Sequence, residues 1–224
     1  MSKNGEKSSG ILEITQKGYG FLRSVEAGLS ISPTDPYLSP RLIQSLRLKT
    51  GMSIVGNGRV LKNQPNVSID TIESVDGVDP KEAGTYPLFP KLTAIDPLER
   101  LKLETGQYPL STRIIDMFVP IGKGQRVLIV SPPKSGKTTM MEEIAHGVME
   151  NHPDITLIML LVDERPEEST HFKKTIDGEI ISTDFDRPVK DHIRVSHLVF
   201  ERIKRLAEAG KDVVVMVDSL TRMG

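Results

Sequence analysis

The sequence predicts a mixed α+β, multidomain fold: an N-terminal β-barrel of the OB or cold-shock type, followed by an incomplete α/β domain. Over residues 10–76, short apolar-alternating runs are separated by Gly, Pro, Asn and Asp, which is typical of a small barrel. Over residues 112–224, continuous apolar runs alternate with helical patterns, which indicates parallel strands covered by helices on both faces.

The segments outside these two parts differ in composition. Residues 1–9 are polar and are expected to form a disordered tail. Residues 77–111 are rich in proline and charge, and are expected to be a linker that runs over the surface.

The overall composition excludes several classes of protein. With 224 residues and a net charge of −1, the chain is large enough for a real core and is not a basic, nucleic-acid-coating protein. The absence of cysteine excludes disulfides and Cys-ligated zinc, and fits a reducing compartment. No apolar run reaches the roughly 18 residues that span a bilayer. We therefore expect a cytoplasmic protein with no membrane segment.

Both domains have elements that can be placed from the pattern. Barrel strands are expected in the runs at 11–15, 19–25, 52–61 and 67–75, with a helical turn after Pro40. In the α/β domain, strands are expected at 126–130, 155–164 and 212–219, and helices at 138–151 and 191–212. The helical stripes expected to be buried are Met141, Ile144, Ala145 and Val148 in the first helix and Val195, Leu198, Val199 and Leu206 in the second.

The stretch SPPKSGKTT, residues 131–139, has the strand–loop–helix context of a phosphate-binding P-loop. It departs from the Gly-x-x-x-x-Gly-Lys-[Ser/Thr] pattern, because Ser131 stands in place of the first glycine and prolines follow it. Prolines have no N–H, so the donors to phosphate must come from the amides at the opening of the helix. The residues predicted to contact the nucleotide are Pro133, Lys134, Ser135, Gly136, Lys137, Thr138 and Thr139. A turn that holds no ligand is the alternative.

Two of these residues have specific predicted roles, and strand ends supply the rest of the site. Lys137 is expected to reach the β- and γ-phosphates of ATP, and Thr138 to hold Mg²⁺ through its hydroxyl. Ligands of open α/β sheets bind at the carboxyl ends of the strands, where Glu164, Arg165 and Asp218 stand.

Each strand-end residue has a predicted part in catalysis. Asp218 is the expected carboxylate for Mg²⁺ and its waters, and Glu164 is the candidate general base for the attacking water. Arg165 is expected to sense the γ-phosphate or to pair with a neighbouring subunit. Taken singly, an acid at a strand end is more often a helix cap.

The string KGYGFLRS, residues 17–24, predicts a site for single-stranded RNA. On an extended strand, Tyr19 and Phe21 point to the same face and form a platform on which unpaired bases stack. Lys17 and Arg23 continue that face and are expected to meet phosphates. The alternative is that both rings belong to the barrel core.

Three segments together resemble one family: VPIGKGQRVLIVSPPKSGKTT (119–139), LVDERPEE (161–168) and VVVMVDSLTR (213–222). They resemble the family of the bacterial transcription termination factor Rho, hexameric RNA-dependent ATPases with a RecA-like motor domain. Members of that family also have a small residue in place of the first glycine of the P-loop. The resemblance implies ATP and Mg²⁺ as cofactors, single-stranded RNA as partner and a homohexamer in the full-length protein. RNA polymerase and elongation factors are further partners that it implies.

The resemblance also implies roles for two further residues, and the sequence departs from the family pattern in two places. It implies that Lys134 helps Lys137 hold the γ-phosphate and that Tyr37 lines the base pocket, where simple packing against neighbouring prolines is the alternative. An aromatic residue that the family usually has on a late barrel strand is missing near Asn66, so the base preference is open. The family's later parts, with its pore loops and arginine finger, lie beyond residue 224, so we expect RNA binding with little ATP hydrolysis. The other interpretations are an F1-type rotary ATPase subunit and an RNA-binding module with a vestigial nucleotide site.

Overall fold

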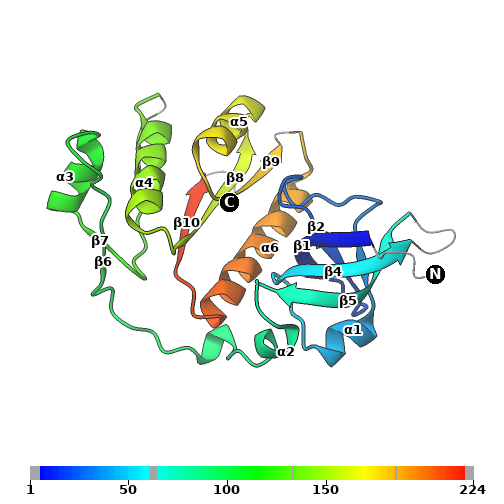
Figure 1. Ribbon diagram of the computed structural model, residues 1–224. Helices are drawn as coiled ribbons and strands as arrows, with labels where there is room; N and C mark the ends of the chain where they lie inside the picture. Colours follow the sequence, from blue (N-terminus) through cyan, green and yellow to red (C-terminus); the bar gives the residue numbers. More distant parts are fainter. Residues whose placement is uncertain (1–5, 61–64, 133, 185, 220–224) are drawn as a thin grey trace.

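The computed structural model describes residues 6–60, 65–132, 134–184 and 186–219, and consists of a closed barrel followed by a parallel sheet with helices (Figure 1). The barrel closes in the order β1-β2-β3-β5-β4. Its strands are β1 (Glu6–Ile14), β2 (Gly20–Arg23), β3 (Tyr37–Leu38), β4 (Ser53–Val60) and β5 (Val67–Val75). The predicted small β-barrel is therefore confirmed.

The barrel begins earlier in the chain than the sequence predicted. Strand β1 pairs with β4 from Glu6 onward, with Glu6 opposite Gly58 and Ser9 opposite Val55. The expectation of a tail is therefore wrong for residues 6–9, and residues 1–5 lie outside the described residues. The reason is that strand pairing uses backbone groups, so polar side chains facing water do not prevent it.

The barrel interior is closed by the expected helical turn. Helix α1 (Pro40–Ser45) is capped by the Ser39 hydroxyl, which accepts a hydrogen bond from the amide of Leu42, and it places Ile43 in the barrel core. The fully buried side chains around it include Leu12, Leu22, Leu38 and Ile54.

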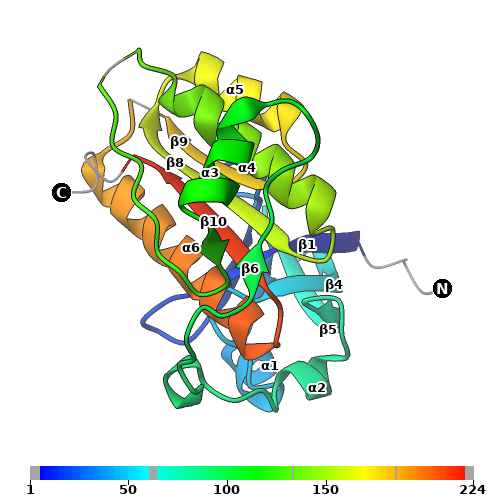
Figure 2. The ribbon, with the colours of Figure 1, turned by 90° about the vertical axis from the view of Figure 1, so that its left-hand side faces the viewer.

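The α/β part has a parallel sheet in the order β10-β8-β9, sandwiched between helices (Figures 1 and 2). Its strands are β8 (Thr156–Glu164), β9 (Glu179–Asp184) and β10 (Val213–Asp218), and its long helices are α4 (Lys137–Asn151), α5 (Pro166–Thr175) and α6 (Val189–Glu208). The strands expected at 155–164 and 212–219 and both expected helices are present. Helix α6 ends at Glu208, and Gly210 just beyond it has the left-handed conformation typical of a residue that follows a helix, with φ of 72°.

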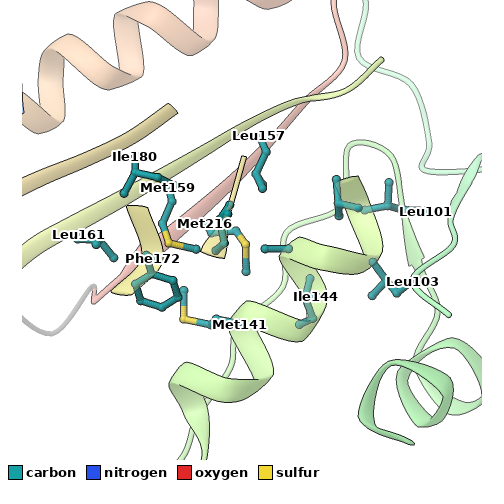
Figure 3. Close-up of a cluster of buried hydrophobic side chains, with 13 residues drawn as sticks. Leu101, Leu103, Met141, Ile144, Leu157, Met159, Leu161, Phe172, Ile180 and Met216 are labelled. Atoms are coloured by element: carbon teal, nitrogen blue, oxygen red, sulfur yellow. The ribbon is translucent and has the colours of Figure 1, made fainter. Parts of the chain in front are cut away.

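Strand β8 is buried on both faces, and its side chains alternate between two cores. Leu157, Met159 and Leu161 pack with α4 and α5, where Met141 and Phe172 meet them (Figure 3). Ile158 and Leu160 point to the opposite face, against α6. The expected buried stripes of α4 and α6 are both buried.

The linker expected over residues 77–111 is only partly a surface segment. Within it lie three short elements: α2 (Pro80–Ala83), η1 (Phe89–Lys91) and β6 (Arg100–Leu101), which pairs with β7 (Ile121–Gly122). Leu101 and Leu103 are buried in the core that contains α4 (Figure 3). The carbonyl of Leu103 lies so close to Gly147 that a Cβ there would approach it to 2.4 Å.

Helix α3 (Leu110–Phe118) was not predicted, and Asp116 ties it to the preceding segment. The Asp116 carboxylate is buried and accepts hydrogen bonds from the amides of Leu103 (2.9 Å) and Glu104 (2.7 Å). Burial alone would raise the pKa of Asp116, but these two amides and Arg100 outweigh it and lower the pKa. None of the helices in the described ranges combines the length and apolar character needed to cross a bilayer.

The strand expected at 126–130 does not form, and this is the main error of the sequence-based prediction. Residues 125–130 have no regular structure, and Val127, Leu128 and Val130 are exposed. A cleft of about 800 Å³ separates this segment from β10. A strand needs a neighbour for its backbone hydrogen bonds, and no strand of the described residues lies between the two. The segment therefore has apolar residues typical of a buried strand but no partner to pair with.

Helix α6 lies between the barrel and the sheet and joins them into one body (Figure 1). Ile11 and Leu29 of the barrel belong to the same buried cluster as α6 and the sheet. Gly51 touches α6 so closely that an added Cβ would come within 2.4 Å of the backbone at Glu201. Beside it, Arg202 forms ion pairs with Asp76 of the barrel and, at 3.0 Å, with Glu179 of β9.

We predict that Arg202→Met lowers the free energy of unfolding by about 3 kcal/mol, because it leaves the buried carboxylate of Asp76 without its partner. Burial alone would lower the pKa of Arg202, but Glu179 and Asp76 outweigh it and raise the pKa, as expected for a fully engaged cation. Urea unfolding measures the change. The control is Arg59→Met, whose pair with Asp70 is exposed, so its effect should stay within about 0.5 kcal/mol. Equal effects of the two substitutions would show that the Arg202 pair does not join the domains.

Candidate nucleotide and RNA sites

The loop before α4 has the backbone geometry of an anion site. Lys134 and Gly136 have positive φ angles of 61° and 92°, so the chain turns sharply twice before the helix begins at Lys137. Alternating conformations of this kind direct successive amides towards one point. Gly136 is the N-cap and supplies no side-chain cap, so the first amides of α4 remain available to a ligand.

The space above this loop is open. A Cβ on Gly136 would meet nothing within 4 Å, so glycine is required there by its left-handed backbone and not by crowding. The hydroxyl of Ser135 donates to the carbonyl of Pro132 (2.7 Å), which closes the loop on its outer side. Thr139 and Lys134 are exposed, and Thr138 is half-buried. Pro133, expected in this loop, lies outside the described residues.

Lys137 forms an ion pair with Asp218, which brings together the two residues predicted from opposite ends of the domain. Asp218 is 1% exposed and ends β10, the strand beside β8. Its Oδ2 atom has no hydrogen-bond partner among the described residues, and neither does the buried hydroxyl of Ser131. A buried carboxylate oxygen without a donor is a position that a cation or its water can satisfy.

The end of β8 is bent at the predicted Asp-Glu-Arg triplet. A register shift between Val162 and Glu164 accompanies a positive φ of 55° at Asp163, so the strand is bulged where it reaches the edge of the sheet. Bulges of this kind redirect side chains near active sites. Glu164 is 7% exposed and its Oε1 accepts from the amide of Arg165 (3.2 Å), whereas Arg165 is exposed.

The electrostatics show that these strand ends lie close together. Burial raises the pKa of Glu168, and the negative charges of Glu164 and Asp218 raise it further, against the opposing charges of Lys137 and Arg165. Glu168, in the first turn of α5, was not singled out from the sequence. Its acidic neighbours become close only when β8, β10 and α5 are packed, so sequence spacing carried no signal for it.

The donor set around Asp218 fits a magnesium ion that is also held by phosphate. No group of three or more His, Cys, Asp or Glu side chains in the described residues is arranged to hold a metal by itself. Mg²⁺ usually takes one or two protein oxygens and completes its shell with water and substrate phosphates. The Oδ2 of Asp218, which has no hydrogen-bond partner among the described residues, is one such protein oxygen.

On the barrel, three aromatic rings gather on one outer face. The ring centroids are 5.7 Å apart for Tyr19 and Phe21, 5.8 Å for Tyr19 and Tyr37, and 5.9 Å for Phe21 and Tyr37. All three are half-buried, and none of them belongs to the buried aliphatic cluster that fills the barrel. We call Tyr19, Phe21 and Tyr37 the ring platform. The neighbours of Tyr37 include two other rings, which simple packing against prolines did not predict.

The two basic residues expected beside the rings differ in their surroundings. Lys17 is exposed and precedes Tyr19 by two residues in the chain. Arg23 is 5% exposed; its Nε donates to Glu13 (2.6 Å) and its Nη1 pairs with Asp35. The expectation that Arg23 meets phosphates is therefore wrong, because both carboxylates already neutralise it. Instead it lies under Phe21, with its guanidinium carbon 5.0 Å from the ring centroid.

The late strand of the barrel has no ring at the position expected from the family pattern. Asn66 donates from Nδ2 to the carbonyl of Asp35 (2.9 Å), so it holds the loop that precedes Tyr37. The Asn66 amide therefore holds the backbone next to Tyr37, but it has no ring on which a base could stack.

Comparisons with known proteins divide the chain into two domains. A family model of the Rho termination factor RNA-binding domain matches residues 8–81, and a model of the nucleotide-binding domain of the ATP synthase alpha/beta family matches residues 111–224. Proteins named transcription termination factor Rho are 44% identical over 229 residues in Neisseria gonorrhoeae and 43% identical over 228 residues in Pseudomonas aeruginosa. The Aquifex aeolicus protein of that name is 44% identical over 218 residues.

These alignments cover 100%, 99% and 95% of this chain, but only 55%, 54% and 50% of the three relatives. The chain thus spans about half the length of the curated relatives it matches. The closed barrel and the sheet with its phosphate-type loop place the chain in a class of proteins that join a small β-barrel to a nucleotide-binding domain. The chain belongs to the ATP synthase alpha/beta family of nucleotide-binding domains, and joins that domain to an RNA-binding domain of the Rho termination factor type.

We predict that Glu168→Gln raises the melting temperature of the nucleotide-free chain at pH 7.5. Because the raised pKa means that the folded chain binds this proton more tightly, stability falls as the pH rises above the ordinary value of 4.5. The gain from the substitution should therefore shrink as the pH is lowered towards 4.5. Glu167→Gln, an exposed change in the same turn of α5, is the control for the loss of an acid at the helix start. A melting temperature that changes equally in both variants at every pH would contradict the crowding of acids around Glu168.

Proposed function

We propose that this chain is the RNA-capturing and nucleotide-binding part of an ATP-dependent RNA translocase that terminates transcription in the cytoplasm. The observation that carries the proposal is the Lys137–Asp218 ion pair beside the open start of α4, in a chain that also has the ring platform. The relatives that match over this whole chain are named for transcription termination. By the same likeness, the working assembly is a homohexamer that engages RNA polymerase and elongation factors.

The RNA would bind first, on the barrel. Tyr19, Phe21 and Tyr37 offer faces and edges on which unpaired bases stack, and exposed Lys17 meets the backbone beside them. Stacking is tolerant of sequence because every base has a π-face, which suits a protein that captures nascent transcripts.

The nucleotide would bind at the start of α4. The amides of residues 134–138 surround its phosphates, and Lys137 exchanges Asp218 for the β- and γ-phosphates. Thr138 and Asp218 would hold Mg²⁺, which neutralises phosphate charge when bound. Glu164 takes the proton of the attacking water, and Arg165, which is exposed, acts on the γ-phosphate or across a subunit boundary.

We propose further that the 224-residue chain turns ATP over slowly by itself. The P-loop is anchored on one side by α4, but on the other side residues 125–130 are outside the sheet. A catalytic site needs its groups held in place before the reaction, and a loop anchored at one end does not hold them. Rapid, RNA-stimulated hydrolysis by this chain would contradict the proposal.

A rotary ATPase subunit is the less favoured function. It accounts for the nucleotide-binding domain but not for the RNA-binding match at residues 8–81 or for the ring platform.

We predict that Phe21→Ala and Tyr19→Ala each weaken the binding of a short single-stranded RNA by about 1–3 kcal/mol, the usual value of one stacked base. Fluorescence anisotropy with a labelled oligonucleotide measures the affinity. Tyr108→Ala is the control, because Tyr108 is an exposed aromatic next to α3, away from the barrel. RNA affinity that survives both platform substitutions would mean that RNA does not bind here.

We predict that Lys137→Ala lowers the affinity for ADP or ATP at least tenfold, because the substitution removes a cation from the phosphates. Isothermal titration with Mg²⁺ present measures it. Lys174→Ala removes an exposed lysine from the far end of α5 and should leave the affinity unchanged. Unchanged affinity in Lys137→Ala would instead favour an RNA-binding module with a vestigial nucleotide site.

A further inference from the structure

The ring platform is supported from below by a series of side chains whose charges alternate in sign. Glu13, Phe21 and Tyr37 lie side by side on β1, β2 and β3, with Glu13 opposite Phe21 and Phe21 opposite Tyr37. Arg23 lies under Phe21 and pairs with both Asp35 and Glu13. The orientation of Arg23, and with it the support of Phe21, depends on where these two carboxylates are held.

Glu13 is held from outside the barrel. Arg194, in the second turn of α6, donates from Nη1 to both carboxylate oxygens of Glu13, at 3.2 and 3.0 Å. Its Nη2 donates to the carbonyl of Leu29 at 2.8 Å, which fixes the guanidinium against the barrel loop that follows β2. The side chains of Arg194 and Glu13 are only 20% and 18% exposed, so this contact is largely shielded from water.

We propose that Arg194, a residue of the nucleotide-binding domain, is a positioning residue for RNA binding by the barrel. It acts through Glu13 and Arg23 on the ring platform and does not itself contact RNA. This inference rests on the proposed RNA site and adds to it a requirement that the barrel residues alone do not reveal.

Two physical effects support the role. Asp35, Arg23, Glu13 and Arg194 form an alternating series of two negative and two positive charges. Removing Arg194 leaves an excess negative charge beneath a surface that must accept a polyanion, and this opposes RNA binding. The loss of Arg194 also lets Glu13 move together with Arg23 away from Phe21. The Phe21 ring, on which bases would stack, then loses its support from below.

The experiment measures RNA affinity of the 224-residue chain with a labelled pyrimidine oligonucleotide over a range of salt concentrations. Arg194→Met should lower the affinity by on the order of tenfold, which is the range found for residues coupled in one charge network. Arg194→Lys keeps the positive charge but cannot contact Glu13 and the Leu29 carbonyl with two separate nitrogens. The affinity for RNA should therefore fall less than in Arg194→Met. The control is Lys204→Met, which removes a cation from the same helix, paired with Glu201 at 2.7 Å, and should change affinity less than twofold.

Two further readouts separate a positioning role from direct contact. The slope of log affinity against log salt should change by less than one in Arg194→Met, since no phosphate contact is lost and the uncompensated charge of Glu13 acts on RNA only from a distance. In the double variant Glu13→Gln/Arg194→Met, the loss should not exceed that of Glu13→Gln alone. A slope reduced by about one, or losses that add fully, would overturn the proposal in favour of a direct RNA contact.

The same series distinguishes failure of this inference from failure of the RNA site. If Phe21→Ala loses affinity while Arg194→Met does not, Arg194 has no positioning role and the RNA site stands. If Phe21→Ala leaves affinity intact, the RNA site itself is wrong, and the inference with it. Thermal melting monitors folding of each variant; should Arg194→Met unfold, Arg194→Lys and Glu13→Gln carry the test, and full affinity in both would overturn the inference.

Discussion

The packing of helix α6 between two β-structures is the constraint on which the rest of the molecule depends. Its buried side chains, Val195 and Leu198 among them, meet the sheet on one side and Ile11 and Leu29 of the barrel on the other. Burial of this many apolar side chains is the main source of stability in a domain. Because one apolar cluster includes residues of both β-structures, the barrel is packed against the α/β part and is not joined to it by the connecting segment alone. Its RNA face keeps a fixed orientation relative to the edge of the sheet where the nucleotide site lies.

The proposed nucleotide site is held by regular structure on one side only. Strands β8 and β10 and helix α4 bring Glu164, Asp218 and Lys137 to one edge, where Lys137 neutralises a carboxylate that is 1% exposed. In the absence of phosphate, that ion pair stabilises the buried charge of Asp218. The segment 126–130 lies across a cleft from β10 and has exposed apolar side chains. The cleft and the exposed segment have the same cause, which is the unpaired edge of β10.

The RNA face is built from polar contacts below and rings above. Arg23 is buried between two carboxylates and faces Phe21, while Glu13 connects it to α6. Two residues before Arg194 on the same helix, the His192 side chain contacts the Thr183 hydroxyl at 2.8 Å, and that hydroxyl accepts from the amide of Asp163. One turn of α6 therefore touches both the support of the ring platform and the bulged strand end that carries Glu164.

The sequence by itself determined the barrel, the strands β8 and β10 and the helices α4 and α6, and it singled out residues for both proposed sites. It could do so because apolar periodicity and the positions of Gly and Pro are local signals. Tertiary structure alone decided whether residues 126–130 form a strand, since pairing needs a neighbour that periodicity does not specify. It also decided that Arg23 is neutralised by Glu13 and Asp35, that Glu168 lies among other acids, and that Arg194 reaches the barrel. The Arg23 contacts form when the barrel closes, and the acids around Glu168 meet when β8, β10 and α5 pack together. Arg194 reaches the barrel only when α6 packs against it, so none of these contacts follows from local sequence pattern.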